Sequence, residues 1–306
     1  MKRAIPGLLL LLVAQLALVA VVYRSELGPA YLGGPPSTTT PDFAAVDTLT
    51  ISDDAGTQAR LKKIGDRWQL PALHDLPADG KKVATLLDSL VTNSSAWPVA
   101  NSVAARQRFK VADYLFRRKI DLLVGSDSLQ TVYLGTSPGF RKIHTRVAGE
   151  DEIRSMPFNL HDAPAGDSAW IDPALLQVRT PMRIDADAYS VNREGGEWLS
   201  GAGHPPEERE LLALLTALRT LRVDGIADAE TTAELAQVDA ELVLDIDSLS
   251  GPVLLSFWQQ DEHYFVRSSE FPVVFRINPY VCERVVGIDF MLMSRQGQES
   301  GQYQRQ

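Results

Sequence analysis

The sequence predicts an α+β protein with two tandem similar modules, each a twisted antiparallel sheet with a packed amphipathic helix, behind one N-terminal transmembrane helix. Three observations carry this prediction. A turn, a tryptophan and an apolar-periodic helix follow one another twice, with Trp68 and Trp198 lying 130 positions apart. Short β-branched stretches are separated by turn residues, which favours antiparallel pairing. One charge-free apolar segment lies near the N-terminus.

The composition is that of a folded protein that is acidic beyond its N-terminal segment. The 306 residues are 45% hydrophobic and 23% charged, enough for two domains with their own cores. Lys2 and Arg3 are the only charges before Arg24, so the rest of the chain holds 28 of the 30 basic residues against all 39 acidic ones, a balance of −11. This balance argues against nucleic acid as a partner, since phosphate binding needs clustered basic residues. The single cysteine, Cys282, excludes an intramolecular disulfide.

The segment 5–23 is predicted to be an uncleaved signal anchor. It carries no charge over 19 residues, close to the roughly 20 that a membrane-spanning helix needs. The alternative is a cleaved signal peptide, whose apolar region is usually about 7–15 residues and ends at a small-residue site. Ala20-Val21-Val22-Tyr23 is a poor site of that kind. Because Lys2 and Arg3 precede the span, residues 1–4 are expected in the cytoplasm and the remaining chain outside it.

A linker at 24–43 leads to the first module at 44–160. The Gly- and Pro-rich run 33–41 offers nothing apolar to bury and is expected to act as a tether. In the module, Val83, Leu86, Leu87 and Leu90 fall at spacings of three and four, which predicts a helix over about 78–92. Strands are predicted at 46–51, 59–64, 68–70, 119–124, 130–134 and 141–147.

The second module, at 181–294, is expected to repeat this order after a connector at 161–180 that contains Trp170. Its strands are predicted near 182–187, 188–193, 198, 241–246, 253–258, 263–267 and 273–277, and its helices at 207–222 and 231–236. The late strands also align, with 119–122 facing 241–244 and Arg154 facing Arg276. The polar tail 295–306 is expected to fray.

Trp68 and Trp198 are most simply read as paired core anchors. Each follows a glycine turn at a matching position, and an indole buries a large aromatic area against a helix. The alternative is a pair of platforms that stack on a ligand.

The best candidate for catalysis is Ser137, in the G-x-S-x-G pattern of residues 135–139. A nucleophile elbow needs a strand, a turn and then a helix, but residues 140–147 read as another strand. Pro138 also removes the backbone N–H that would follow the serine as an oxyanion donor. A hairpin turn therefore explains the pattern better, and Ser137 is not predicted to be a nucleophile.

No other residues form a recognisable chemical site. Ser168 follows Gly166-Asp167 in a loop, which favours a chance match to an esterase signature. Asp185 with Asp187, and Asp245 with Asp247, are expected on the solvated faces of strands. The histidines have no metal-ligand spacing: His74, His144, His161, His204 and His263. The sequence therefore predicts no catalytic, cofactor-binding or metal-binding residues, and no cofactor.

At several of these residues the chain resembles a bacterial family known as domain of unknown function 4340. The matching features are the turn 65–70 with Trp68, the Pro-Ala-Asp start at 77–79, the helix segment 86–90, Leu134-Gly135 and the stretch 169–172. Where the family usually shows Tyr-Gly-Leu, this chain has Phe109-Lys110-Val111. The resemblance implies a membrane-anchored protein, often encoded beside ABC-type exporters and gliding-motility-like auxiliary proteins. It transfers no catalytic residues.

The expected function is that of a non-enzymatic, membrane-anchored accessory subunit of an ABC-type transport system. It would sit in the bacterial inner membrane through residues 5–23, with its globular part on the periplasmic side and a permease or auxiliary subunit as partner. One alternative is a periplasmic module that binds a small ligand or glycan through Trp68 or Trp198. The other is a periplasmic hydrolase that uses Ser137.

Overall fold

The computed structural model describes residues 12–19, 42–92, 98–289 and 293. The chain divides into two units, Met1–Pro41 and Asp42–Gln306. Residues 12–19 of the first unit are helical. Among the described residues, no helix combines the length and the apolar character needed to cross a membrane. The predicted span 5–23 lies outside the described residues except for 12–19, as do most of the predicted linker 24–43 and the tail 295–306.

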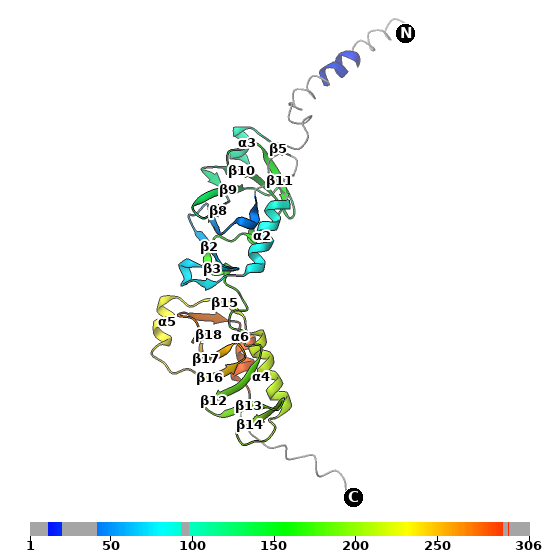
Figure 1. The fold of residues 1–306 in the computed structure, drawn as a ribbon. Coiled ribbons are helices and arrows are strands. Elements are labelled where there is room, and N and C mark those ends of the chain that lie inside the picture. Colours follow the sequence, from blue (N-terminus) through cyan, green and yellow to red (C-terminus); the bar gives the residue numbers. More distant parts are fainter. Residues whose placement is uncertain (1–11, 20–41, 93–97, 290–292, 294–306) are drawn as a thin grey trace. The chain divides into compact units, whose positions relative to one another are not determined.

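The second unit begins with a nine-stranded antiparallel sheet (Figure 1). Its strands are β1 (Thr48–Asp53), β2 (Gln58–Ile64), β3 (Arg67–Leu70), β4 (Leu76–Pro77), β5 (Pro98–Ala100), β8 (Arg118–Val124), β9 (Asp127–Leu134), β10 (Lys142–Val147) and β11 (Ile153–Pro157). They lie in the order β4-β3-β2-β1-β8-β9-β10-β11-β5. Helices α2 (Gly80–Thr92) and α3 (Val103–Arg108) accompany this sheet, and β6 (Val111–Ala112) pairs with β7 (Leu115–Phe116) separately.

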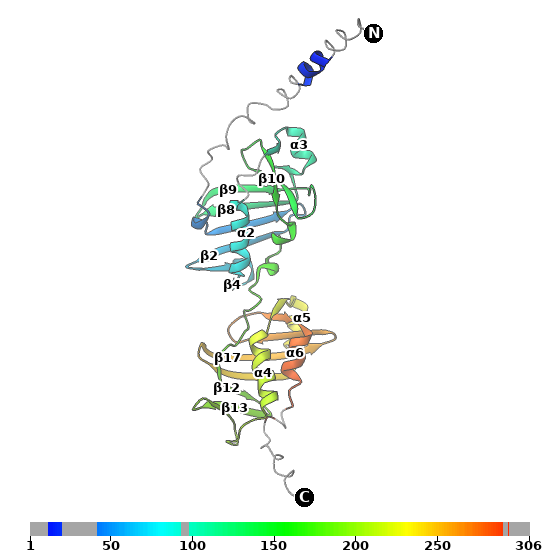
Figure 2. The ribbon, with the colours of Figure 1, turned by 90° about the vertical axis from the view of Figure 1, so that its right-hand side faces the viewer.

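The alternation of β2 marks the face of the first sheet that packs under α2. In β2, Ala59 and Leu61 are buried between exposed neighbours, as expected of side chains that point to opposite faces. Helix α2 contributes Val83, Leu86 and Leu90 to the same buried cluster, and these residues form one stripe at helical spacing. Figure 2 shows α2 lying across the strands of this sheet.

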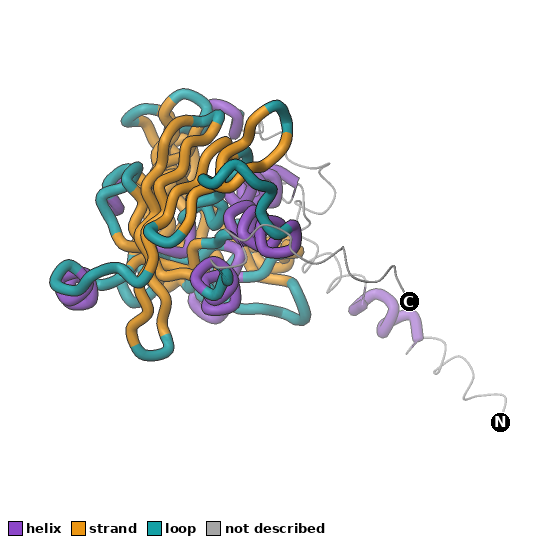
Figure 3. The backbone as a smooth tube through the Cα atoms, turned by 90° about the horizontal axis from the view of Figure 1, so that it is seen from below, coloured by secondary structure: helices purple, strands orange, loops and turns teal. Residues whose placement is uncertain are grey.

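The second sheet has eight antiparallel strands. These are β12 (Pro181–Ala186), β13 (Tyr189–Glu194), β14 (Glu197–Ser200), β15 (Val223–Ile226), β16 (Leu242–Ser248), β17 (Gly251–Gln260), β18 (His263–Ser268) and β19 (Val274–Ile277). Their order is β14-β13-β12-β16-β17-β18-β19-β15. Helices α4 (Glu208–Thr220) and α6 (Pro279–Val286) lie side by side over this sheet (Figure 2), and α5 (Ala229–Leu235) follows β15. Figure 3 distinguishes the strands, helices and loops of the chain.

The structure confirms the α+β class and contains most of the predicted strands and helices. Among the described strands and α-helices, prediction missed β4, β5, α3, β6, β7, β11, β15 and α6. Strand β11 was missed because Arg154 and Ser155 interrupt its apolar alternation. Helix α6 carried a readable signal, since Asn278 caps it and Pro279 occupies its first turn. Asp187 lies just after β12 in a turn, which corrects its expected place on the strand.

Candidate functional site

The motifs on which the family resemblance rests meet at the start of α2. The carbonyl of Trp68 accepts a hydrogen bond from the N–H of Ala78 at 2.8 Å. Asp79 N–H donates to the Trp170 carbonyl at 2.8 Å, and Asp172 N–H donates to the Pro77 carbonyl at 3.0 Å. The Pro-Ala-Asp motif and the 169–172 motif therefore pair with each other through their backbones, as a short antiparallel bridge.

Trp170 anchors this junction. Its side chain is fully buried, and its indole N–H donates to the Pro164 carbonyl at 2.9 Å. The Lys82 ammonium lies 4.8 Å from the ring centroid and donates to the Ala169 carbonyl at 2.8 Å. Burial lowers the pKa of Lys82, while the charges of Asp79 and Asp162 oppose that shift. The junction therefore has the chemistry of a packing contact.

A second pair of motifs meets around Gly135. A Cβ on Gly135 would lie 1.9 Å from the Phe109 carbonyl oxygen, so only glycine lets β9 end against this segment. The N–H of Thr136 donates to the same carbonyl at 2.8 Å. Lys110 has φ 55°, a left-handed conformation that favours glycine. The Leu-Gly motif and the segment that replaces Tyr-Gly-Leu are thus one structural contact.

His144 completes that contact. Its ring stacks on Phe109 at 4.0 Å between centroids with an interplanar angle of 17°. Nδ1 lies 2.9 Å from the carbonyl oxygen of Thr136 and 3.0 Å from its hydroxyl. Burial lowers the pKa of His144, the bond to the Thr136 carbonyl opposes that change, and the Arg108 charge adds to the lowering. His144 therefore packs as a neutral ring, with Nδ1–H donating to the carbonyl.

Ser137 closes a turn. Its exposed hydroxyl donates to the Gly139 carbonyl at 2.6 Å and accepts from the Gly139 N–H at 3.3 Å. The next regular element is strand β10, where a nucleophile elbow would have a helix. Ser137 and His161 both line one surface hollow, of about 400 Å³. The Ser137 hydroxyl donates to the Gly139 carbonyl, and no side chain among the described residues accepts its proton as a catalytic base would.

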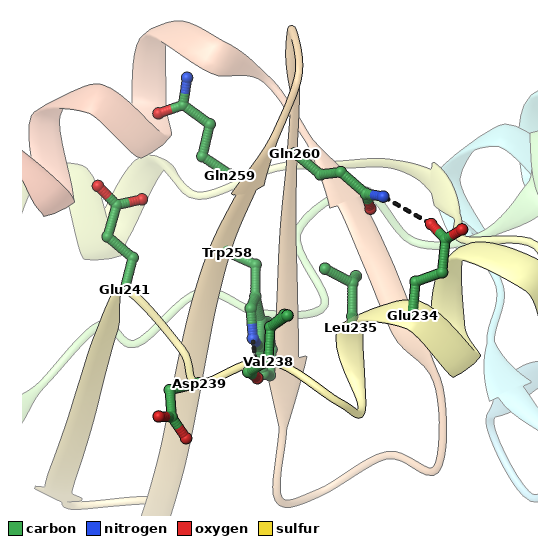
Figure 4. Close-up of a pocket in the computed structure, with 8 residues that line it drawn as sticks. All are labelled: Glu234, Leu235, Val238, Asp239, Glu241, Trp258, Gln259 and Gln260. Carbon is green, nitrogen blue, oxygen red and sulfur yellow. Dashed lines mark hydrogen bonds between the residues drawn. The ribbon is translucent and has the colours of Figure 1, made fainter.

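A different hollow, of about 420 Å³, lies beside α5 and the end of β17 (Figure 4). Trp258 lines it and donates its indole N–H to the Val238 carbonyl at 3.3 Å. The Gln260 amide donates to the Glu234 carboxylate at 2.6 Å. Figure 4 shows Glu234 and Glu241 on opposite sides of Trp258. The Glu234 carboxylate already has Gln260 as its hydrogen-bond partner. We therefore interpret this hollow as part of the acidic protein surface rather than as a reactive site.

The other candidate residues lie apart. Trp68 is 8% exposed, whereas Trp198 is only partly buried against the core, which departs from their expected equal burial. Arg183 bridges Asp185 at 3.2 Å and Asp247 at 3.1 Å on the strand surface. Ser168 is exposed, as are His74, His161, His204 and His263. Among the described residues, no three His, Cys, Asp or Glu side chains are grouped to hold a metal ion.

The sequence did not predict that the basic residues of the hollow beside Ser137 would lie together. Arg117, Arg141 and Lys142 line it, yet no regular spacing in the sequence joins them. Only the pairing of β8, β9 and β10 brings them together. Clustered basic residues in a local stretch would have been a signal, but Arg117 lies 24 positions before Arg141.

Comparison with known proteins gives a family and no described function. A family model described as "Domain of unknown function (DUF4340)" matches residues 68–240, more than half of the 306 residues. No curated protein and no solved structure matches the chain. The match includes Trp68, the α2 junction with Trp170, Gly135 and the part of the second sheet before β16. The chain therefore belongs to the DUF4340 family.

Proposed function

We propose that this protein is a non-enzymatic, membrane-anchored accessory subunit of an ABC-type transport system, with its globular part outside the cytoplasm. The observation that carries the proposal is that the motifs behind the family resemblance have structural roles. Trp68, Ala78, Gly135 and Trp170 all serve backbone pairing or close packing. Because these motif residues of the chain build its fold and form no reactive site, they favour a role in presenting surfaces to a partner over a role in a reaction.

The N-terminal sequence supports the anchored location. Residues 5–23 are free of charge and follow Lys2 and Arg3, the pattern of a signal anchor whose N-terminus stays in the cytoplasm. The predicted linker 24–43, of 20 residues, would keep the globular part within a few tens of Å of the membrane, by coil statistics of about 5–6 Å times the root of the residue number. Confinement of that kind raises the effective concentration toward any membrane neighbour, so weak contacts suffice.

We also propose that residues 44–160 and 181–294 are duplicated modules. The two strand orders support this, because each sheet has a meander of early strands, then a four-stranded meander of late strands, then an earlier strand at the far edge. In chain order, β1–β3, α2, β5, α3 and β8–β11 correspond to β12–β14, α4, β15, α5 and β16–β19. An experimental structure in which the two segments superpose tests the proposal, and two unlike chain paths would contradict it.

The rival functions each lack a favourable observation. A hydrolase would need an activated Ser137, but its hydroxyl bonds to Gly139 within its own turn. A binding module with paired indole platforms would need exposed rings, and Trp68 is buried. Trp198 is partly buried, so it alone does not favour stacking on a glycan.

The partner is tested by photo-crosslinking in intact cells. A photoreactive residue replaces exposed Arg60 or Asp245, one on each sheet, and the crosslinked chain is purified and its partner identified by mass spectrometry. We expect a permease or an auxiliary subunit of a transport system. The same residue at buried Leu61 is the matched control and should capture nothing. Recovery of no transport component, together with full transport after deletion of the protein, would refute the accessory role.

A further inference from the structure

The hollow beside Ser137 is basic, whereas the chain as a whole is acidic. The chain has a formal net charge of −9, yet none of the twelve residues that line this hollow is acidic. Arg117, Arg141 and Lys142 line it together with His161. Like charges placed together repel one another, so an anion that enters is attracted by all of them at once.

The three cations have no internal counter-ion among the described residues. Six other basic side chains of the described part form ion pairs within 4.0 Å: Arg106, Arg118, Lys119, Arg146, Arg154 and Arg183. Arg117, Arg141 and Lys142 are exposed and form none. Their charge is therefore available to a ligand from solution.

The hollow also has an apolar side. Phe140 is 90% exposed, and Ile143 and Phe158 contribute to the lining. The guanidinium carbon of Arg141 lies 5.7 Å from the centroid of the Phe140 ring, which keeps a cation next to an open aromatic face. A volume of about 400 Å³ lies within the usual range of pockets for small organic molecules.

We propose that this hollow binds a phosphate ester that carries an apolar group. Guanidinium groups match phosphate oxygens through paired N–H donors, and an ammonium adds a compact charge. Arg117, Arg141 and Lys142 hold the phosphate, and Phe140 packs against the apolar group. The same chemistry is offered by a soluble phosphate monoester and by a phospholipid headgroup. The proposal is independent of the transport partner, because it concerns a ligand of this chain alone.

The test is isothermal titration calorimetry on the full chain in non-ionic detergent. The probes are phenyl phosphate, monomeric dihexanoyl phosphatidylglycerol, inorganic phosphate and phenol. We expect saturable binding of at least one of the two phosphate esters, weaker binding of inorganic phosphate, and none of phenol. Preference for phenyl phosphate identifies a soluble ligand, and preference for the lipid identifies a headgroup. Higher salt should weaken binding in either case, because the attraction is screened.

Two triple variants separate a site from general charge. Arg117→Gln, Arg141→Gln and Lys142→Gln together should weaken binding of the preferred ester more than tenfold. Arg60→Gln, Lys62→Gln and Arg67→Gln remove the same charge from exposed positions outside the hollow and should leave binding unchanged. Unaltered thermal melting shows that both variants fold. Equal losses in the two variants, or no binding of either ester by the unmodified chain, would overturn the proposal.

Discussion

Gly135 and Ser137 belong to one sequence pattern but meet opposite structural demands. A methyl group on Gly135 would collide with the Phe109 carbonyl, whereas Ser137 is exposed. Gly135→Ala should therefore destabilise the protein at the upper end of about 1–3 kcal/mol. Ser137→Ala should change stability by at most about 0.5 kcal/mol. Urea unfolding measures both, and labelling of Ser137 by a serine-directed covalent probe would contradict its structural role.

Lys110 stands where the family's Tyr-Gly-Leu pattern has its glycine. Its φ of 55° costs a side-chain-bearing residue roughly 1–2 kcal/mol, and glycine avoids that cost at some expense in backbone entropy. Lys110→Gly should stabilise the fold by about 0.5–1 kcal/mol in urea unfolding. Lys62→Gly, in the middle of β2, is the control and should destabilise it. A loss of stability in Lys110→Gly would show that the lysine side chain itself matters.

The two indoles at matching positions should differ in their contribution to stability. Trp68 is 8% exposed, so Trp68→Ala should cost about 3–5 kcal/mol through lost transfer energy and the cavity left behind. Trp198 is only partly buried, so Trp198→Ala should cost about 1–2 kcal/mol. Chemical denaturation compares them directly. A larger loss from Trp198 would show that its packing is closer than its exposure indicates.

At the scale of elements, Arg146 ties β10 to the segment around β6. Its side chain is 2% exposed and donates to the Val111 carbonyl at 2.7 Å and to the Glu150 carbonyl at 3.1 Å. Its guanidinium also pairs with Asp113 and lies 4.9 Å from the centroid of the Tyr133 ring. The hydrogen bond from Arg146 is the main reason that the pKa of Asp113 lies below its usual range.

This pairing gives a dependence of stability on pH. Because folding lowers the pKa of Asp113, its stabilisation is present above the unfolded value of about 3.9 and is lost as pH falls through the folded value. Asp113→Asn should therefore flatten the loss of stability below about pH 4, as measured by urea unfolding across acidic pH. The effect is small because Asp113 is 68% exposed. Asp66→Asn, in an exposed turn, is the matched substitution for comparison, and an unchanged slope in Asp113→Asn would contradict the prediction.

Elements with a strong periodic pattern could be predicted, and elements held by their neighbours could not. Val83, Leu86 and Leu90 form a stripe that reads as α2 without tertiary information. Strand β5 has three residues and exists through its pairing with β11, so local propensity gives no sign of it. The hollow beside Ser137 is harder still to predict, because Arg117, Arg141 and Lys142 become neighbours only through strand pairing.

At the scale of the whole molecule, the acidic balance and the N-terminal segment both bear on how the protein would be held at a membrane. From Arg24 onward the chain carries a balance of −11, which opposes close contact with an anionic membrane surface. A protein of this kind that stays at a membrane needs an anchor and a neighbour other than the lipid. The hollow of Arg117, Arg141 and Lys142 is a local exception that can admit one anionic group without attracting a whole bilayer.

The N-terminal charges then set the expected topology. With Lys2 and Arg3 before the charge-free residues 5–23, residues 24–306 should lie outside the cytoplasm and the chain should keep its N-terminus. Alkaline phosphatase fused after Gln306, which is active only when exported, should be active in whole cells and remain in the membrane fraction after carbonate washing. The control replaces Leu10 and Leu16 by Arg, because two charges within the span oppose its insertion. That variant should lose reporter activity. An inactive reporter on the unaltered chain would reverse the topology, and a mature N-terminus after Ala20 would show that the segment is cleaved and that the globular part is released from the membrane.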